Sequence, residues 1–308
     1  MTPSDNLYRS QYYLFRIGDL ERIWDDYNGS GVNVAVIDDG VEFRHHDLNN
    51  NYNASLHVRI NGQAVVPNPG GPNDGHGTAV AGIIGSERNG SGTVGVAWNS
   101  NLTGVNIFDG PASTPTGFNT ALEQLDRFDV TNNSWGYDAP FALGNNVLFQ
   151  AGLFEDSLET GRNGLGTINV KAAGNSNNNA NGEQIEASRA TVSVAAYTNQ
   201  DQAAGYSNYG ANILVSAPSN GGTVAQTTTD LTGSAGYSAG DYTNSFGGTS
   251  GASPVVAGVV ALMLDANSRL GWRDVQEIIA NSSHEVGSGV GGTPRISENH
   301  NWFYNGDN

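Results

Sequence analysis

Residues 244–272 read "NSFGGTSGASPVVAGVVALMLDANSRLGW" and join a long apolar helix to a start made of very small side chains. Pro254 lies near that start, and proline is tolerated in the first turn because its missing N–H would be unpaired there in any case. Of the hydroxyl residues, Thr249 and Ser253 could be ordinary helix caps. The small residues could instead clear space so that another molecule reaches Ser250, where the positive end of the helix favours an anion.

The apolar runs along the rest of the chain predict an α/β fold. Five of them read as strands: 32–38, 101–108, 129–135, 167–175 and 190–196. They lack clean alternation, which is typical of strands covered on both faces of a parallel sheet. Five segments show helical patterns: 77–86, 116–128, 145–162, 250–266 and 271–283. This alternation predicts one three-layer domain over 1–308, with helices flanking a mostly parallel central sheet and ligands outside its carboxyl edge. Segment 221–245 reads as a polar loop.

The composition limits the classes of function. With 30 acidic and 13 basic residues the formal net charge is −17, which argues against nucleic acid or an anionic membrane as partner. It is compatible with cationic partners, bound calcium, salty surroundings, or simply an acidic surface. The chain has no cysteine, which excludes disulfides and thiolate metal sites. No apolar stretch is long enough to span a membrane, and no leader pattern opens the chain, which predicts a cytoplasmic protein or a mature chain.

Three residues beside glycines carry potential chemistry. Asp38 ends the first predicted strand, His76 begins a helix of small residues, and Ser250 begins the apolar helix. Each has an ordinary explanation taken alone: a turn aspartate, a solvated histidine, a capping serine. Together they supply a hydroxyl nucleophile, a base to remove its proton, and a carboxylate to orient that base.

The surrounding motifs resemble those of a known family. The segments "VAVIDDGVEFRHHDL" (34–48), "HGTAVAG" (76–82) and "GTSGASPVVAGVVALML" (248–264) are similar to the active-site motifs of subtilisin-like serine proteases, in the same Asp, His, Ser order. The segments 88–110, 132–136 and 266–283 look most like the kexin and furin branch. This resemblance, which runs from about Asp5 to Ser283, implies a subtilisin-like fold and a serine endopeptidase that works through an acyl-enzyme.

The resemblance also implies roles for individual residues. Asp38, His76 and Ser250 would form the catalytic triad. The segment "NVKAAGNS" (169–176) is similar to the oxyanion segment of the family. It makes Asn175 a donor to the tetrahedral intermediate, together with the backbone N–H of Ser250. Read without the resemblance, Asn175 is a loop asparagine in an Asn-rich run.

The substrate would be a peptide or protein. By resemblance, Ser134, Trp135 and Gly136 lie along the cleft and pair with an extended peptide. Four acidic residues are candidates for selecting a basic side chain before the scissile bond: Asp39, Asp74, Asp138 and Glu183. Segment 109–120 has only one acid where furin-like relatives carry several, so a single basic residue is expected.

Calcium is the cofactor that the resemblance implies. The matching ligands are the side chains of Asp5, Asp47 and Asn89, with the carbonyls of Glu87, Ser91 and Thr93; oxygen ligands of this kind suit calcium. The alternative is a surface aspartate and a turn. We further expect a monomer, secreted or extracytoplasmic, whose catalytic domain is truncated at its C-terminal end. A subtilisin-like peptide macrocyclase and a catalytically silent binding module of the same fold are the alternative functions.

Overall fold

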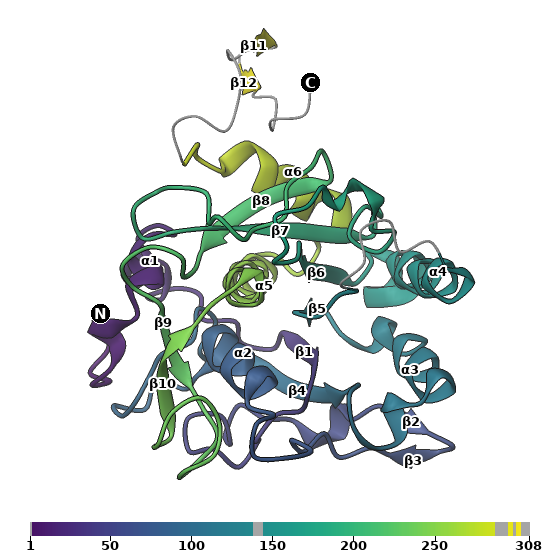
Figure 1. The fold of residues 1–308 in the computed structure, drawn as a ribbon, viewed down its shortest axis with the longest axis horizontal. Coiled ribbons are helices and arrows are strands. Elements are labelled where there is room, and N and C mark those ends of the chain that lie inside the picture. The colour runs from purple at the N-terminus through teal and green to yellow at the C-terminus, as the bar shows by residue number, and fades with distance from the viewer. Residues whose placement is uncertain (1, 138–143, 287–294, 298–299, 303–308) are drawn as a thin grey trace.

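A six-stranded parallel sheet forms the centre of the computed structural model, which describes residues 2–137, 144–286, 295–297 and 300–302 (Figure 1). The strand order is β4-β1-β5-β6-β7-β8. The strands are β1 (Asn33–Asp38), β4 (Asn101–Asn106), β5 (Val130–Asn133), β6 (Ile168–Ala172), β7 (Thr191–Tyr197) and β8 (Ile213–Pro218). The predicted parallel sheet is therefore confirmed, with all five predicted strands in it.

Strand β1 shows why the apolar runs do not alternate. Val34 pairs with Leu102 of β4 on one side and with Val130 of β5 on the other. Successive side chains of a strand point to opposite faces. Val34 and Val36 enter one hydrophobic core, and Ala35 and Ile37 enter a second core on the other face. Both faces are buried, so both sets of positions are apolar.

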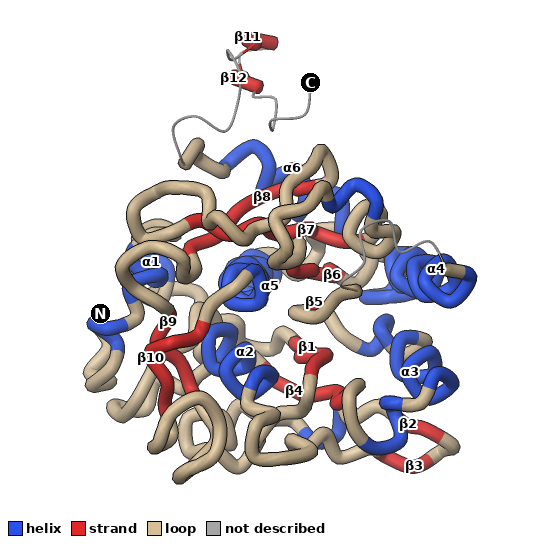
Figure 2. The backbone as a smooth tube through the Cα atoms, viewed as in Figure 1, coloured by secondary structure: helices blue, strands red, loops and turns tan. Residues whose placement is uncertain are grey.

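Helices cover the two faces of the sheet (Figure 2). The helices α2 (His76–Gly85) and α5 (Thr249–Ala266) contact each other and belong to the first core. The helices α3 (Pro115–Leu122) and α4 (Asn145–Thr160) cover the other face. The helix α6 (Trp272–Ser282) contacts β8, and a short α1 (Leu20–Ile23) lies near the N-terminus. All five predicted helices are present in this three-layer arrangement.

Short elements complete the described chain. The short strand pairs are β2 (Arg59–Ile60) with β3 (Gln63–Ala64), β9 (Gln226–Thr229) with β10 (Tyr242–Phe246), and β11 (Arg295–Ser297) with β12 (His300–Trp302). Single 3₁₀ turns are η1 (Tyr8–Ser10), η2 (Tyr12–Phe15), η3 (Ala54–Leu56), η4 (Gly110–Ser113), η5 (Leu125–Arg127), η6 (Gly161–Gly164) and η7 (Ala180–Gly182).

The sequence did not reveal β8, β9 and β10. The prediction of a polar loop over 221–245 is wrong for β9 and for all of β10 except Phe246. Their threonines are β-branched and fit a pleated strand. Thr228 and Thr229 are fully buried because their hydroxyls donate to the carbonyls of Ala79 and Thr78 in α2, both at 2.7 Å. These hydrogen bonds make polar side chains acceptable in the interior.

Helix α5 meets the length and composition expected of a membrane span, in contrast to the sequence prediction that no such segment exists. However, 78% of it is buried inside the protein, in contact with β5, β6, β7 and β8. Its apolar surface is thus explained by the core of this fold.

Candidate active site

The start of helix α5 is held by partners other than helix caps. Gly248 precedes the helix with φ +73°, a conformation that favours glycine. The Thr249 hydroxyl donates to Asn175 Oδ1 at 3.0 Å, and the Ser253 hydroxyl donates to Asn132 Oδ1 at 2.8 Å. Neither hydroxyl caps the helix, so the capping interpretation of Thr249 and Ser253 is wrong.

Pro254 lies deeper in the helix than predicted. It is the sixth residue of α5, not part of the first turn. A residue with an N–H at this position would donate to the carbonyl of Ser250, four residues earlier. Here the hydroxyl of Ser134 donates to that carbonyl instead, at 3.1 Å. In return, Ser250 Oγ donates to the carbonyl of Ser134 at 3.2 Å. The two serines therefore hold one another in place, and Ser134 supplies the hydrogen bond that Pro254 cannot donate.

The glycines at this helix start are explained by packing. A Cβ at Gly251 would lie 1.7 Å from Gln226 Oε1, and a Cβ at Gly247 would lie 2.0 Å from the side chain of Asn220. Gln226 also donates to the Gly251 carbonyl at 3.0 Å. At these two positions the small size makes room for neighbouring side chains of the same chain.

Asp38 and His76 form a directly bonded pair at the carboxyl end of β1. Asp38 Oδ1 lies 2.8 Å from His76 Nδ1, and the Asp38 side chain is buried. Burial by itself lowers the pKa of His76, but the charge and hydrogen bond of Asp38, helped by the charge of Asp39, raise this pKa above its ordinary value. The other ring nitrogen, Nε2, makes no hydrogen bond to a described residue. The pair can therefore orient an imidazole and stabilise its charged form.

Asp39 is engaged by the start of helix α2. Its carboxylate accepts the backbone N–H of Gly77 at 2.7 Å and that of His76 at 3.1 Å. Burial, followed by the charge of Asp38, raises the pKa of Asp39 to about 7. We predicted this residue as a substrate contact, but its visible partners are the first N–H groups of α2. It thereby helps to place His76.

Asn175 is oriented by its contacts with Thr249. Its Oδ1 accepts the backbone N–H of Thr249 at 2.8 Å and the hydroxyl of Thr249 at 3.0 Å. This leaves its Nδ2 as a donor without a partner among the described residues. Asn175 and Ser250 both line one cavity, in which a neighbouring backbone N–H at the start of α5 can act as a second donor.

That cavity, about 110 Å³, brings together four of the seven predicted substrate residues: Ser134, Trp135, Gly136 and Glu183. It is lined by Ser134, Trp135, Gly136, Tyr137, Ala172, Ala173, Gly174, Asn175, Ser176, Glu183, Glu186, Asn208, Thr249 and Ser250. Burial, followed by the charge of Glu186, raises the pKa of Glu183 to about 7. Glu183 Oε2 is buried and has no hydrogen-bond partner among the described residues.

Two charged residues at this cavity were not predicted from the sequence. Glu186 lines the cavity, and Lys171 contacts Glu186 at 2.8 Å from behind. A lysine inside a mostly apolar strand was the only available signal.

Of the other acidic candidates, Asp74 stands apart from this cavity. Asp74 is in the turn before α2, where its N–H donates to the Gly71 carbonyl at 3.2 Å, and it does not line the cavity. Asp138 lies outside the described residues.

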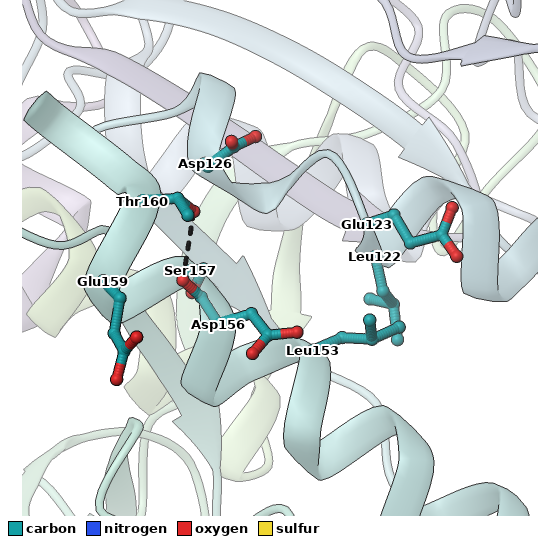
Figure 3. A pocket seen from close by; sticks show the side chains of 8 residues that line it. All are labelled: Leu122, Glu123, Asp126, Leu153, Asp156, Ser157, Glu159 and Thr160. Atoms are coloured by element: carbon teal, nitrogen blue, oxygen red, sulfur yellow. Dashed lines mark hydrogen bonds between the residues drawn. The ribbon is translucent and has the colours of Figure 1, made fainter. Parts of the chain in front are cut away.

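A second cavity, about 260 Å³, lies between α4 and the segment that follows α3, and none of the predicted site residues that the structure describes lines it (Figure 3). Its lining includes four acids: Glu123, Asp126, Asp156 and Glu159. The hydrogen bond drawn there joins the Thr160 hydroxyl to the Asp156 carbonyl at 3.0 Å, which is a contact within α4.

The predicted calcium ligands converge on the loop after α2. Asp5 Oδ1 accepts the backbone N–H groups of Asn89 at 3.0 Å and Gly90 at 2.8 Å, while Asp5 Oδ2 is buried without a partner among the described residues. Asp47 is fully buried; its Oδ1 accepts Asn89 Nδ2 at 3.1 Å and its Oδ2 accepts the Thr93 N–H at 2.9 Å. Burial raises the pKa of Asp47.

These observations fit a cation that takes oxygen ligands. Two buried carboxylates beside one amide side chain, one of them with an unpartnered oxygen, are the donor set that calcium prefers. The Glu87 carboxylate is not available, because it accepts both the N–H and the side-chain amide of Asn50 at 2.7 Å. Ser91 N–H donates to Asn89 Oδ1 at 2.9 Å. Among the described residues no cluster of three His, Asp or Glu side chains could hold a metal, so backbone oxygens would be needed too.

Comparison with known proteins identifies the class. Residues 29–300 match the subtilase family (Peptidase_S8), and the chain belongs to this family of serine proteases. Neuroendocrine convertase 2 of Caenorhabditis elegans is 33% identical over 306 residues, which cover 90% of this chain and 45% of that protein. A calcium-dependent protease of Trichormus variabilis is 31% identical over 291 residues, covering 87% of this chain and 44% of that protein. The resemblance to convertases is thus confirmed, at moderate identity.

A solved structure shares the fold. The serine protease of Aeromonas sobria superposes with a TM-score of 0.82 at 28% identity, over 93% of this chain and 59% of that chain. The subtilisin-like fold predicted from the sequence is therefore confirmed. The chain spans about half the length of the two relatives named above.

Proposed function

We propose that this chain is a serine endopeptidase in which Ser250 is the nucleophile, His76 the general base and Asp38 the residue that orients the base. The observation that carries this proposal is the 2.8 Å contact between Asp38 Oδ1 and His76 Nδ1. It holds the imidazole with Nε2 as the acceptor, since the N–H faces the carboxylate.

The first step forms an acyl-enzyme. Ser250 Oγ, which donates to the Ser134 carbonyl in this structure, would leave that carbonyl and turn toward His76. His76 Nε2 takes the proton as Oγ attacks the scissile carbonyl, and Asp38 stabilises the imidazolium. His76 then gives the proton to the leaving amine. Water, activated by the same imidazole, hydrolyses the ester and restores the Ser250 hydroxyl.

Two donors would hold the oxyanion. Asn175 Nδ2 has no partner among the described residues, because Thr249 occupies the other side of the amide. The Ser250 N–H belongs to the first turn of α5, where N–H groups have no acceptor within the helix. Fixed donors of this kind stabilise a negative charge that develops only in the transition state.

We propose a preference for a basic residue before the scissile bond. Two carboxylates, Glu183 and Glu186, line the cavity next to Ser250. The cavity also contains Ser134, Trp135 and Gly136, which would pair with the backbone of an extended peptide. An arginine or lysine side chain entering there would meet a buried, unpartnered carboxylate oxygen of Glu183.

We also propose calcium as a structural cofactor. Asp5, Asp47 and Asn89 would hold it with backbone oxygens of the loop 87–93, and the relative named a calcium-dependent protease supports this. Bound calcium would neutralise two buried carboxylates and tie the N-terminal segment to the loop after α2.

The test of the function uses one substitution and one label. Ser250→Ala should abolish peptide hydrolysis while the fold stays intact by circular dichroism. A fluorophosphonate should transfer its phosphonyl group to Ser250 of the unchanged chain, with loss of fluoride, and to no residue of this variant; mass spectrometry detects the adduct. Ser282→Ala, an equal change at an exposed serine of α6, is the control. Full activity in the Ser250→Ala variant would refute the assignment, and cyclic products in place of hydrolysed ones would assign a macrocyclase.

A further inference from the structure

Lys171 is the only lysine of the chain, and its side chain is completely buried in β6. A buried ammonium is costly unless it is paired. Its Nζ forms an ion pair with Glu186 Oε1 at 2.8 Å and donates to the Trp135 carbonyl. It also lies 4.7 Å from the centre of the Trp135 ring, a distance suited to a cation–π contact.

All of these partners line the cavity beside Ser250, whereas Lys171 itself lies behind the wall. Gly136 lies between Lys171 and the cavity. A Cβ at Gly136 would lie 3.3 Å from Glu186 Oε1 and 3.6 Å from Lys171 Nζ. The ion pair therefore reaches the bare backbone of the cleft, with no side chain in between.

The charges around this cavity do not balance. Glu183 and Glu186 are both buried, and Lys171 directly contacts only Glu186. Glu183 Oε2 has no hydrogen-bond partner among the described residues. The described charges that change the pKa of Glu183 are those of Glu186 and Lys171. The charge of Glu186 also raises the pKa of the Tyr137 hydroxyl, after the larger effect of burial. When both carboxyls are ionised, two carboxylates and one ammonium leave one negative charge, and a cationic ligand would favour the ionised form of Glu183 despite its raised pKa.

We propose that Lys171 is a specificity-determining residue of this pocket. By neutralising Glu186 it leaves Glu183 as the single anionic partner, so the pocket accepts a side chain that carries one positive charge. This inference rests on the proposed peptidase function and deepens it. Lys171 acts through Glu186 and Trp135, not by touching the substrate.

The proposal predicts that the preference for a positively charged substrate side chain follows the net charge of Glu183, Glu186 and Lys171. The assay compares the kcat/KM of two peptides that differ only in arginine or citrulline before the scissile bond, because citrulline has the same shape without the charge. Glu183→Gln should lower the arginine-to-citrulline ratio at least tenfold. Glu186→Gln should lower it similarly, because Lys171 would then compensate Glu183.

The decisive variant removes both members of the ion pair. Lys171→Met with Glu186→Gln has the same net charge as the unchanged pocket, and its ratio should return to within about threefold of the original. Lys171→Met alone leaves two uncompensated carboxylates and should raise the ratio, but it is expected to be unstable. An unchanged ratio in Glu186→Gln, or a double variant as poor as Glu186→Gln, would overturn the proposal.

A second measurement needs neither catalysis nor a substitution. Because the chain has one lysine, ¹³C-lysine labelling gives one set of side-chain signals. Benzamidine, whose amidinium resembles the end of arginine, should shift the Lys171 Cε signal as it binds. Benzamidine binding without any shift would contradict the proposal. Absence of fluorophosphonate labelling and of all peptide cleavage would instead refute the peptidase function, which keeps the two failures distinguishable.

Discussion

The contact between Ser134 and the Ser250 carbonyl leads to a quantitative prediction. Pro254 has no N–H, so the Ser250 carbonyl depends on the Ser134 hydroxyl, which donates to it at 3.1 Å. Both residues are buried, at 6% and 8% exposure, so water replaces the lost donor poorly. Ser134→Ala should therefore lower the free energy of unfolding by about 1–3 kcal/mol.

Pro254→Ala tests the cause. It restores an N–H four residues after Ser250, which can donate to the same carbonyl. In that background Ser134→Ala should cost about 1–2 kcal/mol less, since the carbonyl would keep one partner. The Asn132 side chain, which donates to Ser134 Oγ at 2.9 Å, loses its acceptor in both backgrounds, so this loss cancels.

The assay is equilibrium unfolding in urea, followed by tryptophan fluorescence. All variants carry Ser250→Ala, so that self-digestion cannot distort the curves; the Ser134 hydroxyl still meets the same carbonyl. Ser157→Ala is the control, because this buried serine of α4 donates to the Phe154 carbonyl at 2.7 Å, far from Pro254. It should cost the same in both backgrounds. An equal cost of Ser134→Ala in both backgrounds would refute the reasoning.

Three further predictions concern catalysis and the metal. Asn175→Ala should lower kcat about 10²–10³-fold with little change in KM, measured by steady-state kinetics, and a loss below threefold would exclude it as an oxyanion donor. The raised pKa of His76 should place the acid limb of the kcat/KM profile above the ordinary imidazole value, since only the neutral ring accepts the Ser250 proton. Asp38→Asn should move that limb to lower pH, and an unmoved limb would assign it to another group. Calcium should raise the melting temperature and a chelator should lower it, and Asp5→Asn should remove most of this difference; the same calcium shift in Asp5→Asn would disprove the site.

The central sheet could be predicted because most of its strands are rich in apolar residues. Val34 and Ile37 face opposite cores, yet both are apolar, so the strand is visible without knowledge of its partners. Strand β9 could not be predicted in this way. Thr228 carries a hydroxyl, and its hydrogen bond to the Ala79 carbonyl makes that hydroxyl acceptable in the core. That acceptor belongs to a helix 149 positions away in the sequence.

The residue types of the candidate site were also readable in advance. A carboxylate at a strand end, a histidine between glycines and a serine at a helix start are local features, and the structure brings Asp38 and His76 together. The prediction that Pro254 lies in the first turn was wrong. A sequence shows that Pro254 has no N–H, but it does not show which other group donates to the Ser250 carbonyl in its place. Ser134, 116 positions from Ser250, supplies that group.

The charge of the pocket depends on packing more than on any motif. Lys171 lies in a strand whose other described side chains are all buried, and its partner Glu186 lies in a loop before the next strand. Read locally, Glu183 and Glu186 are two equivalent acids, and the pocket would be assigned two negative charges. The ammonium behind Gly136 makes them unequal, because it pairs with Glu186 and leaves Glu183 Oε2 without a hydrogen-bond partner in the described part of the chain. In the proposed function, selection of one basic side chain would therefore depend on a residue that the substrate does not reach.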